Sequence, residues 1–232
     1  MSENEHHYCM CIRPEEGRDG TKAALLNQYK WAKGESITIR FLEGDAKLQK
    51  RVEAAAREWV DQNKKMANLF LKFMPMDAKN TDIRIAFQKG NGSWSYLGTY
   101  CRQIPEPEPT MNYGWIDANS PESELRRVVL HEFGHALGLI HEHQNPKGGI
   151  KWNRDAVIHD LSGPPNRWNS AQIENNMFNK YAPSEVSGTL VDAKSIMMYP
   201  IPKSWTLDGF SAGMNGELSE QDKTFIRFAY PA

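Results

Sequence analysis

The sequence of 232 residues predicts an α+β fold, in which a twisted mixed five-stranded sheet carries helices on one side. Two patterns predict it. Between residues 36 and 116, short runs rich in β-branched and aromatic residues are separated by turn residues, as in strands. The stretch 45–60 and the stretch after Ser120 instead repeat apolar residues every three or four positions, as in helices. After residue 141 the chain is rich in Asn, Pro and Gly, which predicts an irregular, helical second lobe.

The expected elements follow one another along the chain. Residues 1–35 are expected to form a polar arm with a short helix near residues 22–31. Strands are expected at residues 36–42, 69–74, 82–87, 94–98 and 111–116. Asp45 is expected to cap a helix whose apolar stripe consists of Leu48, Val52, Ala55, Ala56, Trp59 and Val60. A long helix should follow Pro121, and two more are expected near residues 154–161 and 171–181.

These elements predict two parts of the chain. The first is the arm, residues 1–35, and the second is one domain, residues 36–232. Within that domain we expect an upper lobe of about residues 36–141 and a lower lobe of about residues 142–232.

The composition limits the function classes. A net charge of −1 gives no electrostatic reason to bind nucleic acid or a membrane surface, and no apolar run approaches the ~18 residues of a membrane span. Three cysteines, Cys9, Cys11 and Cys101, do not make a disulfide scaffold, and the polar N-terminus lacks a signal peptide. We therefore expect a monomer with no nucleic-acid or membrane partner. It should be cytoplasmic or exported without an N-terminal signal peptide, unless a leader has been removed.

The run from His131 to His141, H-E-F-G-H-A-L-G-L-I-H, is the strongest chemical signal in the sequence. Residues four apart share a helix face, so His131 and His135 can direct their imidazoles at one metal ion. His141 would point elsewhere on a continued helix, but Gly138 can adopt a positive φ and turn the chain out of it. Three nitrogens and one open position are the pattern of a catalytic zinc site. The sequence therefore predicts one catalytic Zn²⁺ held by the three histidines.

Glu132 follows the first histidine and is rotated from it by about 100° around the helix. Its carboxylate should therefore lie beside the metal, where it can take a proton from a zinc-bound water. A surface helix with two histidines and a salt-bridging glutamate would explain H-E-x-x-H alone. It does not explain the glycine and the third histidine at their spacings, so we predict a zinc hydrolase.

A second motif, Ser195-Ile196-Met197-Met198-Tyr199-Pro200, lies downstream. A zinc helix followed by a methionine turn resembles the metzincin clan of metallopeptidases. The resemblance implies the metzincin (zincin-like) fold, with the sheet and the zinc helix in the upper lobe and Met197 as an apolar floor beneath the histidines. The pattern S-x-M-x-Y resembles astacins and serralysins, which implies that Tyr199 ligates zinc and later swings to the reacting carbonyl. Ordinary packing is the alternative for both residues.

Three further features resemble astacins, and the similarity runs from about Ile37 to Tyr230. Glu142 follows the third histidine, as in astacins, and residues 92–98, G-S-W-S-Y-L-G, resemble the astacin segment G-C-W-S-Y-V-G. Residues 218–230 resemble the closing helix motif L-S-x-x-D-x-x-x-I-x-x-x-Y. Ser93 and Pro231 stand where astacins carry disulfide cysteines, so the usual two disulfides cannot form. Met198 replaces a histidine often found at its place, which we expect to change pocket contacts rather than catalysis.

The resemblance implies a metalloendopeptidase that acts on proteins or peptides. We expect a zinc-bound water to attack the scissile carbonyl, with Glu132 as general base and Tyr199 as oxyanion stabiliser and switchable ligand. The substrate should lie extended and antiparallel to an edge strand made of Trp94, Ser95, Tyr96, Leu97 and Gly98. Residues 200–212 should form the pocket wall that selects side chains. The alternatives are an inactive binding module on this fold and a zinc exopeptidase or other amide hydrolase.

The arm offers a possible latency device. A thiolate is a good zinc ligand, so Cys9 or Cys11 could occupy the open zinc position. We favour the alternative, an arm that packs on the surface or is disordered. Residues 41–45, F-L-E-G-D, superficially resemble the F-x-G-D of astacin propeptides, but the spacing is one residue too long and we read Asp45 as a helix cap. His143 and His159 are expected to be surface or structural histidines.

Overall fold

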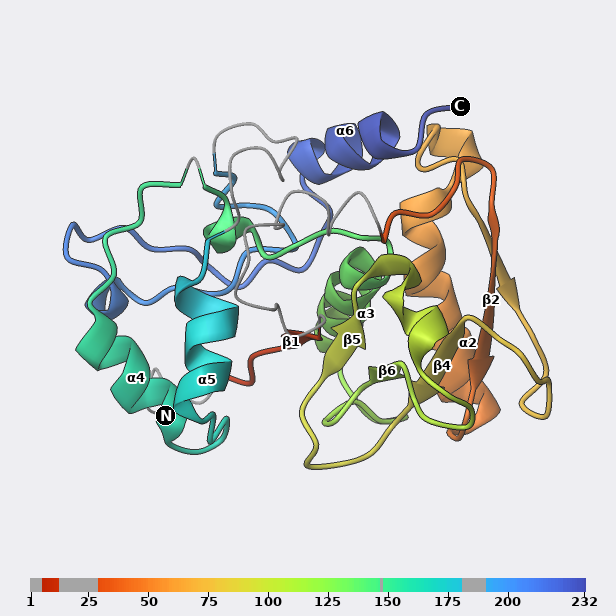
Figure 1. The fold of residues 1–232 in the computed structure, drawn as a ribbon, viewed down its shortest axis with the longest axis horizontal. Helices are drawn as coiled ribbons and strands as arrows, with labels where there is room; N and C mark the ends of the chain where they lie inside the picture. The colour runs from red at the N-terminus through yellow and green to blue at the C-terminus, as the bar shows by residue number, and fades with distance from the viewer. Residues whose placement is uncertain (1–5, 13–28, 147, 181–190) are drawn as a thin grey trace.

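The computed structural model describes residues 6–12, 29–146, 148–180 and 191–232. It contains a six-stranded sheet in the order β1-β5-β6-β4-β2-β3. Figure 1 shows β2, β4, β5 and β6 on the side of the molecule that carries α2 and α3. All paired strands are parallel except β5 and β6. The strands are β1 Met10–Ile12, β2 Ser36–Phe41, β3 Phe70–Phe73, β4 Ile83–Ala86, β5 Trp94–Tyr96 and β6 Met111–Asn112. The five predicted strands are therefore confirmed, and the arm adds a sixth, β1.

The helices also follow the sequence pattern. The longer helices are α2 Ala46–Ala56, α3 Glu122–Ala136, α4 Arg154–Ser162 and α6 Glu220–Ala229. The helix expected near residues 171–181 is split into α5 Ser170–Ile173 and a π-helical turn, Glu174–Phe178. Short 3₁₀ helices are formed by Arg57–Val60, Gln62–Lys64, Gly98–Gln103, Glu142–Gln144 and Lys203–Trp205. The short helix expected near residues 22–31 lies largely outside the described residues.

Helix α2 begins where its capping residue predicts. The Asp45 carboxylate accepts hydrogen bonds from the backbone N–H groups of Lys47 and Leu48, both at 2.9 Å. The apolar stripe of α2 packs against α3, and the indole N–H of Trp59, just beyond α2, donates to the Leu130 carbonyl at 2.9 Å. Helix α3 is thereby fixed inside the protein, which gives the motif that it carries a rigid base.

The described residues form two hydrophobic cores. The first core lies among the sheet, α2 and α3, and it includes Met197. The second core lies among α4, α5 and the segment after residue 197, and it includes Met198 and Tyr199. The turn of residues 195–200 therefore runs between the two cores. In Figure 1, β1 also lies between the half with α4 and α5 and the half with α2 and α3.

Neither a membrane span nor a disulfide is found in the described part of the chain. Its helices are too short or too polar to cross a bilayer. Cys9, Cys11 and Cys101 all carry thiols. Ser93, at the position of a family cysteine, is buried, and its hydroxyl accepts a hydrogen bond from the Gly114 N–H at 3.1 Å. The chain at Ser93 is therefore held by a hydrogen bond and by packing.

Met197 packs directly on α3 at Gly134, and this contact predicts the effect of a substitution. Alanine normally stabilises a helix relative to glycine by up to ~1 kcal/mol. A Cβ at Gly134, however, would lie 2.3 Å from the Met197 sulfur. Because overpacking costs about 1–3 kcal/mol, we expect Gly134→Ala to lower Tm by a few degrees.

Thermal unfolding followed by circular dichroism measures this, with Gly149→Ala as the matched control. A Cβ at Gly149 meets nothing within 4 Å. A Gly134→Ala chain as stable as the unchanged chain would show that Met197 is free to move away from α3.

Candidate active site

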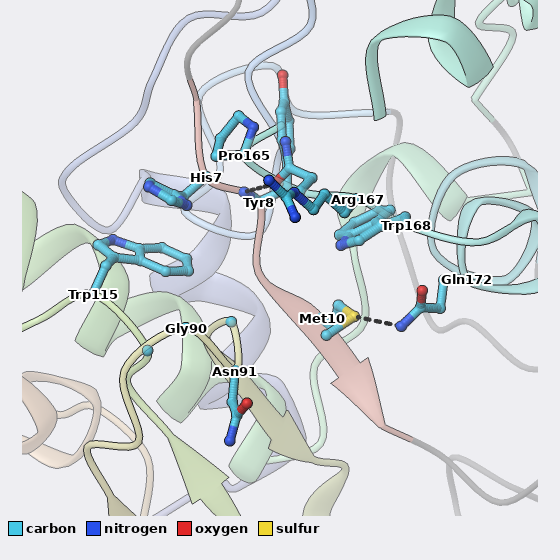
Figure 2. Close-up of a pocket in the computed structure, with 13 residues that line it drawn as sticks. His7, Tyr8, Met10, Gly90, Asn91, Trp115, Pro165, Arg167, Trp168 and Gln172 are labelled. Atoms are coloured by element: carbon cyan, nitrogen blue, oxygen red, sulfur yellow. Dashed lines mark hydrogen bonds between the residues drawn. The ribbon is translucent and has the colours of Figure 1, made fainter. Parts of the chain in front are cut away.

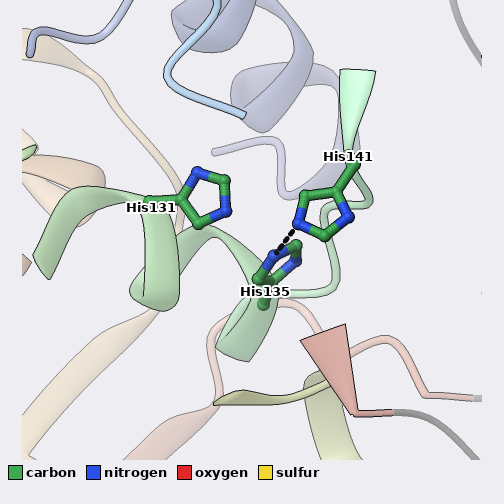
Figure 3. Close-up of side chains that lie close together, drawn as sticks. All are labelled: His131, His135 and His141. Carbon is green, nitrogen blue, oxygen red and sulfur yellow. Dashed lines mark hydrogen bonds between the residues drawn. The ribbon is translucent and has the colours of Figure 1, made fainter. Parts of the chain in front are cut away.

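The three predicted histidines come together at the end of α3. His131 and His135 lie on the helix, and the chain leaves it at Gly138, whose φ is +94°. The N–H groups of Gly138 and Leu139 close the helix end on the carbonyls of His135 and Gly134, at 2.8 and 2.9 Å. The next turn returns His141, so that one nitrogen of each imidazole lies within 4.8 Å of the other two (Figure 3). The sequence prediction for Gly138 is confirmed.

The hydrogen bonds of these imidazoles test whether a cation fits between them. The Nδ1 atoms of His131 and His135 each lie 2.8 Å from a backbone carbonyl, of Ile196 and Leu139. A carbonyl only accepts, so each Nδ1 carries the hydrogen and each Nε2 keeps a lone pair. The Nε2 of His131 has no hydrogen-bond partner among the described residues, and the Nε2 atoms of His135 and His141 face each other at 3.0 Å.

Burial reinforces this arrangement. All three imidazoles are buried, which lowers the pKa of each below its usual value, to about 4 for His135. Neutral rings with converging lone pairs repel one another unless a cation lies between them. The donor set therefore fits a metal ion such as zinc.

Glu132 lies beside this group and is completely buried. Neither of its carboxylate oxygens makes a regular hydrogen bond in the described part of the chain, although the Cys9 thiol interacts with the carboxyl group. Burial raises the pKa of Glu132 well above its usual value. A buried carboxyl group with such a pKa is suited to taking up and releasing a proton.

Tyr199 reaches the same place from the turn of residues 195–200. Its ring centroid lies 4.3 Å from that of His141 and 5.9 Å from that of His131. Its hydroxyl donates a hydrogen bond to the backbone carbonyl of Cys9. A peptide carbonyl group therefore lies against the Tyr199 phenol.

Asp222 holds this turn in place, a role that sequence reasoning missed. Its carboxylate accepts hydrogen bonds from the Ser195 hydroxyl at 2.6 Å and the Ile196 N–H at 2.8 Å. It also closes the capping box of α6 with Ser219. The aspartate of the closing motif was the signal that could have found it. On the other side, the Glu142 N–H donates to the Met197 carbonyl at 3.0 Å, so Glu142 ties the third histidine's loop to the same turn.

Residues 6–12 of the arm pass through the site, which corrects our expectation that the arm packs on the surface or is disordered. His7 stacks on Trp115 at 4.7 Å, Tyr8 enters the second core, and Cys9 is buried next to Glu132. A cavity of about 270 Å³ remains alongside His7, Tyr8 and Met10 (Figure 2). The signal was the apolar run Tyr8–Ile12 inside an otherwise polar arm.

The predicted edge strand is also corrected. Strand β5 ends at Tyr96, and β1 pairs with it in parallel, Met10 opposite Trp94 and Ile12 opposite Tyr96, so its edge is covered. Leu97 and Gly98 lie beyond the strand. Gly98, with φ +49°, begins a 3₁₀ helix. Only glycine fits there, because a Cβ would lie 1.9 Å from the Tyr29 carbonyl oxygen.

His143 and His159, the two further histidines considered from the sequence, do not belong to the metal-ligating group. His143 is buried, and its Nε2 lies 2.7 Å from the Asn176 carbonyl, so its role is structural. His159 lies on the surface of α4, 3.0 Å from the carboxylate of Asp160. Both agree with the sequence-based expectation.

Comparisons with known proteins give the same assignment. The model of the Astacin peptidase family matches residues 24–225. A structure of myroilysin superposes with a TM-score of 0.83 at 40% identity, covering 89% of this chain and 98% of that chain. A crystal structure of myroilysin gives a TM-score of 0.69 at 37% identity, covering 100% of this chain and 94% of that chain. Protein SpAN of Strongylocentrotus purpuratus is 25% identical over 138 residues, 56% of this chain, and the match spans 19% of that protein.

The family match includes the zinc helix, the methionine turn and most of the closing helix. The similarity to the two myroilysin structures extends over nearly the whole chain. The mixed sheet and the group of three histidines agree with the metzincin fold. The chain belongs to the astacin family of peptidases and is a metalloendopeptidase.

Proposed function

We propose that this metalloendopeptidase uses one catalytic zinc, held by His131, His135 and His141, with Tyr199 as a further ligand that can move away. The observation that carries the proposal is the convergence of three buried, neutral imidazole nitrogens on one point, with hydrogen bonds that fix their lone pairs inward. When bound, zinc supplies a Lewis acid for the scissile carbonyl and for the attacking water.

Glu132 and Tyr199 carry the remaining steps. Glu132 accepts the proton of the attacking water and passes it to the leaving nitrogen, since it lies beside the metal group without a regular hydrogen bond of its own. Tyr199 donates its hydroxyl hydrogen to the oxygen on which negative charge develops, as it donates to the Cys9 carbonyl here.

The substrate is proposed to bind extended along β5 and antiparallel to it. Support comes from β1, which shows that this edge accepts an extended chain through main-chain hydrogen bonds. Met10 N–H donates to the Ser93 carbonyl at 2.9 Å, and Leu97 N–H donates to the Ile12 carbonyl at 3.1 Å. Because β1 runs parallel to β5, the arm lies in the opposite direction to the proposed substrate.

Metal content and proteolysis test the proposal together. Elemental mass spectrometry should find one zinc per chain, and none in His135→Gln. A chain without residues 1–12 should cleave a denatured protein at internal bonds, lose this activity with a chelator and regain it with zinc. Cleavage that persists after the metal is removed would overturn the proposal, as would release of single residues from the chain ends only.

Tyr199→Phe separates transition-state stabilisation from binding. We expect kcat to fall by roughly 10–10³-fold with little change in KM, because the phenol acts where charge develops. Steady-state kinetics on a fluorogenic peptide measures both constants in the chain without residues 1–12. A rise in KM at unchanged kcat would make Tyr199 a substrate-binding residue.

A further inference from the structure

The arm places one aromatic side chain in a preformed pocket beside the reaction site. Tyr8 is 6% exposed, and its ring stacks on Trp205 with a centroid distance of 5.3 Å. Its edge meets Trp168 at 6.3 Å and Tyr199 at 5.2 Å, and its hydroxyl donates to the Pro200 carbonyl at 3.0 Å. The pocket thus has aromatic walls and one acceptor placed for a phenolic hydroxyl.

Two of the walls, Trp168 and Trp205, are held by hydrogen bonds to residues outside the arm. The backbone N–H of Trp168 donates to the Leu161 carbonyl at 2.9 Å, within the second core. The indole N–H of Trp205 donates to the Asp160 carboxylate at 2.7 Å, and its backbone N–H donates to Pro202 at 3.0 Å. Since these bonds join residues of the second core and its surroundings to one another, we expect these two walls to keep their places when Tyr8 leaves.

The main chain around Tyr8 is held by one side-chain amide. Asn166 accepts a hydrogen bond from the Tyr8 N–H at 3.0 Å and donates one to the His6 carbonyl at 2.9 Å. Both bonds are made to backbone groups, so they do not depend on the side chains of the bound peptide. Asn166 lies next to Arg167 and Trp168, which line the cavity beside the arm (Figure 2).

We infer that the pocket filled by Tyr8 is a substrate subsite that selects aromatic side chains, tyrosine first, and that Asn166 binds the substrate main chain beside it. This inference rests on the proposed endopeptidase function and names its substrate class. One wall is Tyr199, and the neighbouring residue Cys9 touches Glu132 and Tyr199, so a side chain in this pocket belongs to a residue next to the reacting bond.

The polarity of the pocket explains the order of preference. The Pro200 carbonyl accepts a hydrogen bond from the hydroxyl group of a tyrosine side chain. Phenylalanine has no hydroxyl group, so it leaves this carbonyl without a donor. Asp160 lies behind Trp205, so the pocket has negative charge near it and disfavours aspartate and glutamate. We expect tyrosine over phenylalanine, and both over aliphatic and acidic residues.

A peptide library cleaved by the chain without residues 1–12 tests the inference. Tyrosine and phenylalanine should be enriched at one position relative to the cleaved bond. Trp168→Leu should reduce this preference at least ~10-fold, as expected when an aromatic contact surface is lost. Trp115→Leu is the matched control, since Trp115 contacts His7 outside the pocket, and it should keep the preference. Cleavage without aromatic enrichment, or enrichment unchanged in Trp168→Leu, overturns the subsite and leaves the endopeptidase standing.

A binding experiment decides the inference even if no peptide is cleaved. A synthetic peptide of residues 6–12, H-H-Y-C-M-C-I, is added to the zinc-loaded chain without residues 1–12, and Kd is measured by calorimetry. We expect Tyr8→Ala in the peptide to weaken binding at least ~10-fold and Tyr8→Phe only a few-fold. His7→Ala should change Kd less than Tyr8→Ala. Equal affinity of the unchanged peptide and its Tyr8→Ala variant overturns the pocket, whereas the absence of cleavage would count against the proposed function alone.

Discussion

Glu132→Ala is expected to bind zinc as the unchanged chain does and to lose at least ~10²-fold in kcat. Glu132 is a neighbour of the histidine group and not a member of it. Its buried oxygens make no regular hydrogen bond in the described residues, so their removal leaves few groups unpaired. The substitution should therefore spare the metal and the fold while removing the proton acceptor.

The measurement is steady-state cleavage of a fluorogenic peptide, with zinc determined on the same preparation. The chain without residues 1–12 is the right background, because the arm contacts Glu132 and would otherwise mask the comparison. His135→Gln serves as the control that loses both zinc and activity. If Glu132→Ala keeps a third or more of kcat, the role of general base is wrong.

Removing residues 1–12 is expected to raise kcat/KM at least ~10-fold. The arm engages Glu132, Tyr199 and the edge of β5 at once, so a substrate must displace it. A covalently attached competitor acts at an effective concentration in the millimolar range, far above typical substrate concentrations. A longer deletion, to residue 35, is unsuitable, because Trp31 is buried in the first core and its indole N–H donates to the Ala136 carbonyl at 2.7 Å.

Two single substitutions refine this prediction. Cys9→Ser should raise activity less than the deletion does, since Tyr8 and β1 stay in place. Cys11→Ser is the matched control, with a half-buried thiol on β1, and should behave as the unchanged chain. The measurement is kcat/KM for one peptide across all four chains. Equal values for the deleted and full-length chains would show that the arm leaves the site freely in solution.

The part of the site that sequence predicts is the part set by local geometry. The spacing of His131 and His135 fixes one helix face, and Gly138 has a single conformational role, so both could be read from eleven consecutive residues. The five strands and the Asp45 cap likewise depend on near neighbours. Each of these predictions uses interactions within a few residues.

The position of the arm could not be predicted in the same way. β1 pairs with β5, more than 80 residues away, and Tyr8 fills a pocket built from residues 168 and 205. The polar composition of residues 1–35 favoured a surface location for the arm, because the few apolar side chains at Tyr8–Ile12 change the average over 35 residues very little. Asp222 was missed for a related reason, since a helix-capping motif does not reveal that the same carboxylate also anchors a distant turn.

The turn of residues 195–200 has a practical consequence for measuring the fraction of protein in a preparation that is catalytically active. Met197, His131 and His135 are carried by the first core, whereas Tyr199 is carried by the second. Retention of zinc on the three histidines therefore does not by itself show that Tyr199, in the second core, is in place. A heated or aged sample can keep its full zinc content while its phenol is out of place. Batches of this enzyme should therefore be compared by active-site titration rather than by metal analysis.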